Sequence, residues 1–499
     1  MNKFYITTPI YYVNDKPHIG HAYTTVAADV LARWHRSQGE EVFFLTGTDE
    51  HGAKVAQAAA KAGQSAREFC DGKAEDFKNA WQALDIQYDN FIRTTDPAHE
   101  AAVQKTLQIL YDKGFIYKGQ YEGLYCPGCE QYKIADDLID GQCPDHQIEP
   151  QLMKEESYFF KLSHFQKELE KRIAGDELKI EPKERKNEVL SFIKSGLADI
   201  SISRQNVSWG IPLPFDRQYT TYVWVDAFLN YLTGLGWDGN SVDKFKSSQV
   251  SKSGENDFSK TYKLKNLQTD ELNFWPPDVQ LMSKDILRVH ATIWPGLLLA
   301  LDIPLPKRIF VHGFFTLDGQ KMSKSQGNVI WPQELVQKFG ADASRYLLLA
   351  STPFGRDGDI SWEKLTEKYN ADLANGLGNL ISRVFNLIES NFEGKVVAAG
   401  GVNLDIASQM RELKLFEALR SIKEKIDWAN KYIDETKIWE LVKQDKVEAK
   451  KVLGDLLGVI IKITESLAPF MPEVAEKILR SAGAEKIQKG EVLFPRAIL

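Results

Sequence analysis

Hydrophobic residues near the start of the chain follow first the pattern of a strand and then that of a helix. The apolar run Phe4–Thr7 predicts a buried strand, and Val26, Val30 and Trp34 recur at the spacing of one helix face. The run Glu41–Thr46 predicts a second buried strand. Strand, helix and strand in this order predict a βαβ unit, whose ligands bind beyond the carboxyl ends of the parallel strands.

The pattern changes after residue 115. Residues 116–215 mix strand-like and amphipathic segments, which predicts an inserted domain. Apolar runs of strand type return at Tyr222–Ala227 and Arg308–His312, on either side of an apolar helix, and predict the second half of the same sheet. The polar tract Ser247–Asp257 between them predicts a surface loop.

Strand patterns end near Ser361, and successive helical patterns follow, broken by Pro469 and Pro472. We therefore expect an α/β protein with a C-terminal α-helical bundle. The expected Rossmann-type parallel-sheet domain comes in two halves, residues 1–115 and 216–360. Residues 116–215 are expected to form the insertion between them, and residues 361–499 the helical domain.

Composition is that of a soluble globular protein, with 499 residues, 43% hydrophobic and 26% charged. No apolar stretch is long enough to span a bilayer, and the N-terminus lacks the layout of a signal peptide. We expect a cytoplasmic protein without a membrane partner. The net charge of −7 does not exclude a nucleic-acid partner, because a basic groove can be local.

Two ligand pairs in the insertion predict a metal site. Cys126-x2-Cys129 and Cys143-x2-His146 are separated by thirteen residues, a spacing at which two tight turns can close a tetrahedral zinc site. Four protein ligands leave no open position, so we expect one structural Zn²⁺ per chain. The alternative is a surface histidine beside spare thiols. Cys70, isolated on a predicted helix, is expected to be a small buried hydrophobe.

Two remote motifs predict a nucleotide site. His18-Ile19-Gly20-His21 joins the first predicted strand to the first predicted helix, where free N–H groups and the helix dipole favour an anion. Gly20 lets a flat ring approach the backbone, and the histidines can donate hydrogen bonds to phosphate. Lys321-Met322-Ser323-Lys324-Ser325 can clamp pyrophosphate from the other side. Either motif alone is also consistent with chance or with a solvated basic loop.

The two motifs together resemble the signature of class I aminoacyl-tRNA synthetases. The resemblance implies ATP with Mg²⁺, and catalytic roles for His18, His21, Lys321 and Lys324. It also implies ATP contacts from those four residues and from Gly20, Asp285 and Ser323, with Asp285 at the ribose.

Four further segments resemble methionyl-tRNA synthetase, in its compact form with one zinc knuckle: Thr8–Asn14, Gly47–Gly52, Val223–Ala227 and Lys284–Ile286 with His290. The resemblance implies that L-methionine is held by Ile10, Tyr12, Asp49, Trp224, Ala227, Tyr231, Ile286 and His290, with Asp49 near the α-amino group. Aromatic walls suit a thioether, although each aromatic side chain taken alone is more often ordinary core.

The same resemblance assigns the anticodon to three residues of the helical region, Asn379, Arg383 and Trp439. Asn379 and Arg383 lie four residues apart and share a helix face, and unstacked bases need an aromatic plate and hydrogen-bonding edges. The alternatives are an asparagine that caps a turn and a tryptophan in a helix-bundle core. The implied partner is tRNA(Met), initiator and elongator, and we expect a monomer.

The resulting hypothesis is a ligase that forms methionyl-adenylate from methionine and ATP and transfers it to tRNA(Met). The alternatives are a small nucleotidyltransferase, which would lack the zinc insertion and the helical region, and a non-catalytic RNA-binding protein built on a decayed synthetase. Isoleucyl, valyl and leucyl enzymes need large editing insertions that this length cannot hold. A cysteinyl enzyme would need a zinc ion with a position open to the substrate thiolate.

Overall fold

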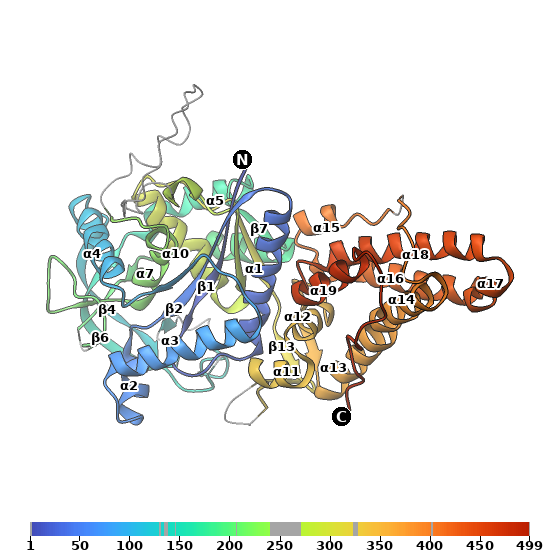
Figure 1. Ribbon diagram of the computed structural model, residues 1–499. Coiled ribbons are helices and arrows are strands. Elements are labelled where there is room, and N and C mark those ends of the chain that lie inside the picture. Colours follow the sequence, from blue (N-terminus) through green and yellow to red (C-terminus); the bar gives the residue numbers. More distant parts are fainter. Residues whose placement is uncertain are drawn as a thin grey trace, which may run out of the picture.

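The computed structural model describes residues 2–128, 131–133, 138–144, 146–205, 207–239, 271–322, 328–400 and 403–498. An α/β body contains the first two thirds of the chain, and an elongated helical lobe formed by the C-terminal third extends from one side of it (Figure 1). The α/β class with a helical C-terminal region, predicted from hydrophobic periodicity, is confirmed.

The central sheet of the body has six parallel strands in the order β3-β2-β1-β11-β12-β7. In that order the strands are Asn90–Arg93, Glu41–Asp49, Lys3–Tyr12, Val279–Ser283, Arg308–His312 and Lys179–Glu181. The strands predicted at the first two apolar runs and at Arg308–His312 are confirmed as β1, β2 and β12. At the carboxyl end of β1, Tyr12 pairs with Asp49 of β2, so the ends of neighbouring strands meet at one edge.

Helices cover both faces of this sheet. On one face lie α1 (Ile19–Ser37), α3 (Ala66–Ala83), α11 (Pro332–Phe339) and α12 (Ala341–Ala350), in a core that continues into the helical lobe. The other face packs against α4 (Pro97–Asp112), α8 (Asn230–Thr233) and α10 (Leu287–Ala300). The result is a three-layer body typical of doubly wound α/β domains.

The prediction of a strand over Tyr222–Ala227 is wrong. Val223–Phe228 forms a short helix, α7, preceded by Tyr222 in an extended conformation. Four of the five residues that follow Val223 in α7 are buried, and Trp224 alone is half-buried. A helix buried on nearly all sides has no amphipathic period, so a short apolar run cannot distinguish it from a strand.

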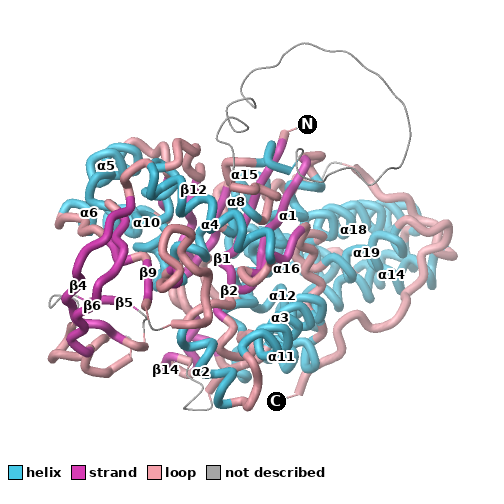
Figure 2. Tube along the Cα trace, turned by 90° about the vertical axis from the view of Figure 1, so that its left-hand side faces the viewer, coloured by secondary structure: helices cyan, strands magenta, loops and turns pink. Residues whose placement is uncertain are grey.

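The expected insertion does not coincide with one structural unit. Residues 116–215 include an antiparallel sheet, β5-β4-β6-β8, and the helices α5 (Gln166–Ala174) and α6 (Lys183–Lys194). Its strands are Gln131–Lys133, Ile116–Cys126, Gln151–Phe160 and Ile200–Ser201. This sheet lies at the end of the molecule opposite the helical lobe (Figure 2). However, β7 pairs with β12 as an edge strand of the central sheet, so part of the expected insertion completes the Rossmann-type domain.

The helical lobe follows the small sheet β14-β13-β15 (Gln320–Lys321, Phe315–Leu317 and Gly358–Ile360). Its elements are α13 (Trp362–Lys368), the π-helical segment Tyr369–Gly378, α14 (Asn379–Phe392), α15 (Ala407–Arg411), α16 (Leu415–Glu435), α17 (Ile438–Gln444), α18 (Lys446–Leu467) and α19 (Pro472–Ala482). Among the described residues beyond 361 no strand occurs, as predicted. Pro472 begins α19, where its missing N–H costs no hydrogen bond.

A buried arginine joins the lobe to the sheet domain. Arg345 of α12 lies 2.6 Å from Asp29 of α1, and both side chains are fully inaccessible. The same guanidinium donates hydrogen bonds to the carbonyl oxygens of Pro469 and Phe470 in the lobe. Removal of one partner of such a pair typically costs about 3–5 kcal/mol. Helix α1, whose N-cap is His18, is therefore fixed to the C-terminal helices through Arg345.

Candidate active site

A cavity of about 600 Å³ opens where the carboxyl ends of the central strands meet the N-terminus of α1. Its walls include twelve of the residues predicted to bind ATP or methionine. These are Ile10, Tyr12, His18, Gly20, His21, Asp49, Trp224, Ala227, Tyr231, Asp285, Ile286 and His290. Positions up to 280 residues apart in sequence thus surround one space.

The first turn of α1 is closed by its two histidines. Nδ1 of His18 accepts the Gly20 N–H at 3.0 Å, and Nδ1 of His21 accepts the His18 N–H at 3.1 Å. The two rings stack with centroids 3.9 Å apart. Because both Nδ1 atoms are acceptors, each neutral ring carries its proton on Nε2 and can donate from that atom.

The position of the His18 ring requires a glycine at residue 20. A Cβ atom at residue 20 would lie 2.8 Å from Cε1 of His18 and 3.0 Å from its Nδ1. These separations are shorter than van der Waals contact, so a side chain here would push the imidazole away from the helix N-terminus.

The late lysine-rich motif approaches the same cavity. Gln320–Lys321 forms β14, which pairs with β13, and Met322 lies in the cavity wall. The side chain of Lys321 and the predicted residues Ser323 and Lys324 lie outside the described residues. The two motifs therefore reach one space from the N-terminal and C-terminal halves of the sheet domain.

Hydrogen bonds order the apolar end of the cavity. His290 Nδ1–H donates to the Ile286 carbonyl at 2.9 Å, so Nε2 accepts the Tyr231 hydroxyl, also at 2.9 Å. Burial lowers the pKa of His290 to about 4 and raises the pKa of the Tyr231 hydroxyl. Both groups are consequently neutral at pH 7, which suits an uncharged side chain as ligand.

Aromatic rings line this end of the cavity. The Trp224 and His290 rings lie 6.2 Å apart, edge to face, and Phe228 packs against His290 with ring centroids 4.9 Å apart. Phe228 lies in the cavity wall but was not predicted from the sequence. Its position one helical turn after Trp224 would have indicated it, had Val223–Phe228 been recognised as a helix.

A second residue that the sequence did not indicate is His312, at the carboxyl end of β12. Its Nε2 lies 2.6 Å from the Thr24 hydroxyl of α1, and its Nδ1 lies 2.8 Å from the Gly313 carbonyl. Burial lowers the pKa of His312. The contact ties α1 to the strand that leads to the lysine-rich motif. A polar residue at the end of a predicted strand was the available signal.

Three of the four predicted zinc ligands converge. The ligand atoms of Cys126, Cys143 and His146 lie within 4.8 Å of one another, and Cys129 lies outside the described residues. A Cβ at Gly128 would lie only 2.3 Å from His146 Cγ, so the imidazole packs directly on the turn after Cys126. Two thiols, one of them beside an imidazole on a tight turn, form a donor set that fits Zn²⁺.

The knuckle also borders the cavity, whose walls include Gly128 and His146. Lys54 of α2 (Ala53–Lys61) donates a hydrogen bond to the Gly128 carbonyl. Cys70 is fully buried in α3, as expected, and burial raises the pKa of its thiol to about 12.

The predicted anticodon residues gather in the helical lobe. Arg383 of α14 lies with its guanidinium carbon 5.9 Å from the centre of the Trp439 ring of α17 and forms an ion pair with Asp434 at 2.5 Å. Asn379 lies one turn before Arg383 and contacts Asn430 at 3.3 Å. Trp439 keeps 42% of its surface exposed, so it is not a core residue.

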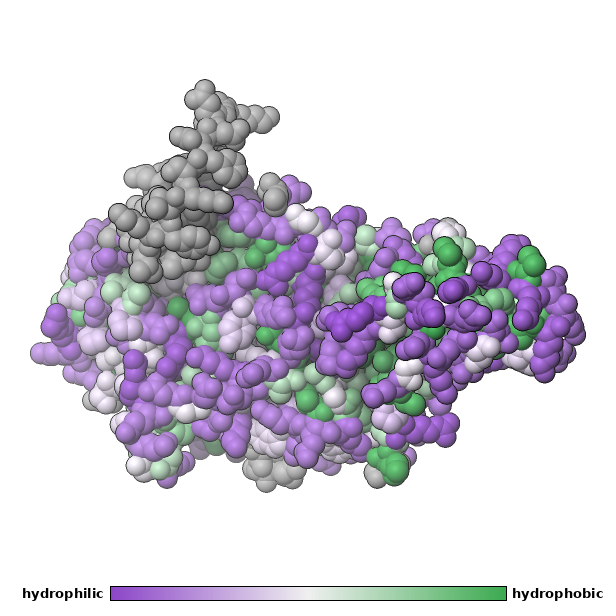
Figure 3. Space-filling view, viewed as in Figure 1, coloured by the Kyte–Doolittle hydropathy of each residue, from purple (hydrophilic) through white to green (hydrophobic). Residues whose placement is uncertain are grey.

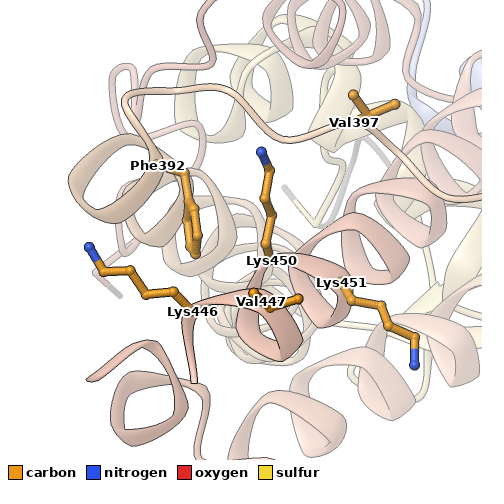
Figure 4. A pocket seen from close by; sticks show the side chains of 6 residues that line it. All are labelled: Phe392, Val397, Lys446, Val447, Lys450 and Lys451. Carbon is orange, nitrogen blue, oxygen red and sulfur yellow. The ribbon is translucent and has the colours of Figure 1, made fainter. Parts of the chain in front are cut away.

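A second hollow, of about 460 Å³, lies on the lobe between the end of α14 and the start of α18 (Figure 4). Its walls combine Phe392 and two highly exposed valines, Val397 and Val447, with three lysines. The lobe surface is otherwise mostly hydrophilic on the side seen in Figure 3. The described lining has no histidine or carboxylate, so it offers no set of ligands for a metal ion.

Comparisons with known proteins agree with this geometry. A family profile described as tRNA synthetases class I (M) matches residues 4–152 and 146–385. The chain, with its parallel sheet and the His-x-Gly-His turn at the first helix, is thus a class I aminoacyl-tRNA synthetase. None of the helices in the described part of the chain is long and apolar enough to cross a bilayer.

The relatives narrow the assignment to one amino acid. Methionine–tRNA ligase of Caldanaerobacter subterraneus is 42% identical, over 99% of this chain and 78% of the relative, and that of Streptomyces coelicolor is 40% identical over 99% and 96%. Mycobacterium tuberculosis methionyl-tRNA synthetase in complex with methionyl-adenylate superposes with a TM-score of 0.86 at 34% identity, over 100% of this chain and 99% of that one. The chain belongs to the methionyl-tRNA synthetase family, and it is an aminoacyl-tRNA ligase.

Proposed function

We propose that the chain activates L-methionine with ATP and transfers the methionyl group to tRNA(Met), and that the residues around the 600 Å³ cavity perform the first step. The observation that carries this proposal is the convergence of the α1 N-terminus and the aromatic, neutral pocket around His290 on one space. A small nucleotidyltransferase is excluded, because the similarity extends over 99% of the chain, including the helical lobe.

In the first step the methionine carboxylate attacks the α-phosphorus of ATP in line. A new P–O bond forms, the bond to the β-phosphate oxygen breaks, and pyrophosphate leaves. No covalent enzyme intermediate is needed, so the chain contributes positioning and charge stabilisation. His18 and His21 donate from Nε2 to phosphate oxygens, Gly20 lies under the adenine, and Asp285 holds the ribose.

The lysine-rich motif stabilises the leaving group. Lys321 and Lys324, together with Ser323, bind the pyrophosphate as its negative charge develops. Mg²⁺ bound with ATP would neutralise part of the same charge. At the other end Asp49 pairs with the methionine ammonium, and the remaining pocket residues enclose the thioether, whose sulfur contacts aromatic rings.

A zinc ion held by Cys126, Cys129, Cys143 and His146 is structural in this proposal. Four protein ligands leave no position for substrate, which argues against a cysteinyl enzyme. The ion would stabilise the turns of the knuckle that borders the cavity, and a chelator should loosen this part of the chain.

In the second step a ribose hydroxyl of the terminal adenosine of tRNA attacks the adenylate carbonyl, and AMP leaves. We propose that Trp439 stacks with an anticodon base while Asn379 and Arg383 contact base edges, in initiator and elongator tRNA(Met) alike. The helical region 361–499 thus serves as the anticodon-binding domain. We further propose a cytoplasmic monomer.

ATP–pyrophosphate exchange across the twenty amino acids tests the proposal directly. We expect strong exchange with methionine and at least about a hundredfold less with the other amino acids, because pocket shape and a buried polar network both select the side chain. Equal exchange with isoleucine or cysteine would contradict the pocket assignment. An absence of exchange with every amino acid would support the decayed, non-catalytic alternative.

A further inference from the structure

Two buried, oppositely charged side chains lie behind the methionine end of the cavity. His51 follows β2, two residues after Asp49, and Asp226 lies in the first turn of α7. Nδ1 of His51 is 2.9 Å from Oδ2 of Asp226, and the side chains are 4% and 0% exposed. Neither of the two is among the residues that line the cavity, so neither has a part in the chemistry described above.

The His51 ring faces a carboxylate on each side. Its Nε2 lies 3.6 Å from Oε1 of Glu100, in the first turn of α4. Two acceptors on opposite ring nitrogens favour the doubly protonated imidazolium. Burial alone would lower the pKa of His51, but the hydrogen bond and the charge of Asp226 outweigh burial and raise the pKa to about 10. The ring is therefore a fixed cation at neutral pH.

The loop that carries Asp49 is anchored on its other side as well. Glu50 is fully buried, and its Oε1 lies 2.7 Å from Nε of Arg93. Trp209 donates from its indole nitrogen to the Glu50 carbonyl at 2.6 Å, and its ring meets the edge of His51. Asp49 is thus followed by two residues that cannot move without breaking buried ion pairs.

We propose that the His51–Asp226 pair positions the amino-acid substrate by fixing the loop of Asp49 relative to α7. This inference rests on the proposed function, in which Asp49 binds the ammonium while Trp224 and Ala227 of α7 line the side-chain end. A substrate held at its two ends by two separate elements binds well only when those elements keep their spacing. His51 and Asp226 are therefore positioning residues, without contact to substrate.

The test measures exchange kinetics for methionine and for ATP separately. In His51→Ala we expect the KM for methionine to rise by about 10- to 100-fold, while the KM for ATP changes by less than about twofold, because α1 is not attached to this pair. Asp226→Asn should likewise raise the KM for methionine and leave the KM for ATP nearly unchanged. His51→Asn should recover part of the methionine affinity, because its amide N–H can take the place of Nδ1–H.

His35→Gln is the matched control. His35, in the last turn of α1, is a half-buried histidine whose Nδ1 lies 2.7 Å from Oε2 of Glu40, and neither residue lines the cavity. We expect both KM values to stay within about twofold of the wild type in this variant, even where the melting temperature falls.

The outcomes separate the two proposals. If the wild type shows no methionine-dependent exchange, the proposed function fails. If the wild type is active and folded His51→Ala or Asp226→Asn keeps the wild-type KM for methionine, only the positioning role is overturned. An equal rise of both KM values would show a merely structural pair and would also overturn it. If His51→Ala does not fold, the KM for methionine is compared with the KM for ATP in His51→Asn and Asp226→Asn instead, and the same outcomes decide on the positioning role.

Discussion

The contact between Gly128 and His146 gives a sharp test of the zinc knuckle. In Gly128→Ala the new Cβ would lie 2.3 Å from Cγ, 2.5 Å from Cδ2 and 2.8 Å from Cβ of His146. Ordinary carbon–carbon contact begins near 3.5 Å, so the imidazole would have to move by roughly 1 Å. Metal–ligand distances tolerate only about 0.2 Å, so the ring cannot both avoid the methyl group and keep its bond to zinc.

We expect the zinc affinity of Gly128→Ala to fall by about 10- to 100-fold, the effect typical of a displaced group next to a metal ligand. This factor corresponds to about 1.4–2.7 kcal/mol. The affinity is measured by competition with a chromophoric chelator, and the zinc content by metal analysis. In parallel, chelator should lower the melting temperature of the wild type more than that of the variant.

Gly72→Ala is the matched control. Gly72 lies within α3, and a Cβ there would meet nothing within 4 Å. This change should leave zinc binding intact and stabilise the protein by about 0.5–1 kcal/mol, because alanine is the better helix former. Zinc binding by Gly128→Ala as tight as that of the wild type would refute His146 as a ligand.

Three further predictions concern other parts of the chain. Lys324→Ala should lower the exchange rate by at least about a hundredfold with the KM for methionine nearly kept; near-normal exchange would remove Lys324 from catalysis. Trp439→Ala should lower aminoacylation by about 10- to 100-fold with exchange unchanged, whereas Trp428→Ala, an equally exposed tryptophan at 45%, should spare both reactions. His290 binds a proton near pH 6.5 when unfolded but only near 4 when folded, so the free energy of unfolding should fall as pH drops between these values, by about 3 kcal/mol in total. Chemical denaturation at several pH values measures this loss, and an identical pH dependence in His290→Asn would contradict it.

Local patterns in the sequence were sufficient for several features. The first strand–turn–helix unit could be predicted because apolar periodicity and the histidine turn both act within a few residues. The spacing of the ligand pairs was likewise enough to predict that Cys126, Cys143 and His146 meet, because two ligands separated by two residues need only one tight turn between them. The helical lobe followed from a sustained helical period beyond residue 361.

The sequence by itself determined the α/β class, the order of the main elements and the family of the chain. Only the tertiary structure decided that Val223–Phe228 is a helix and that β7 completes the central sheet, because a fully buried segment has no period and an edge strand is defined by its partner. It also decided which charges are buried together. His51 and Asp226 are 175 residues apart, and no local pattern records that their side chains meet.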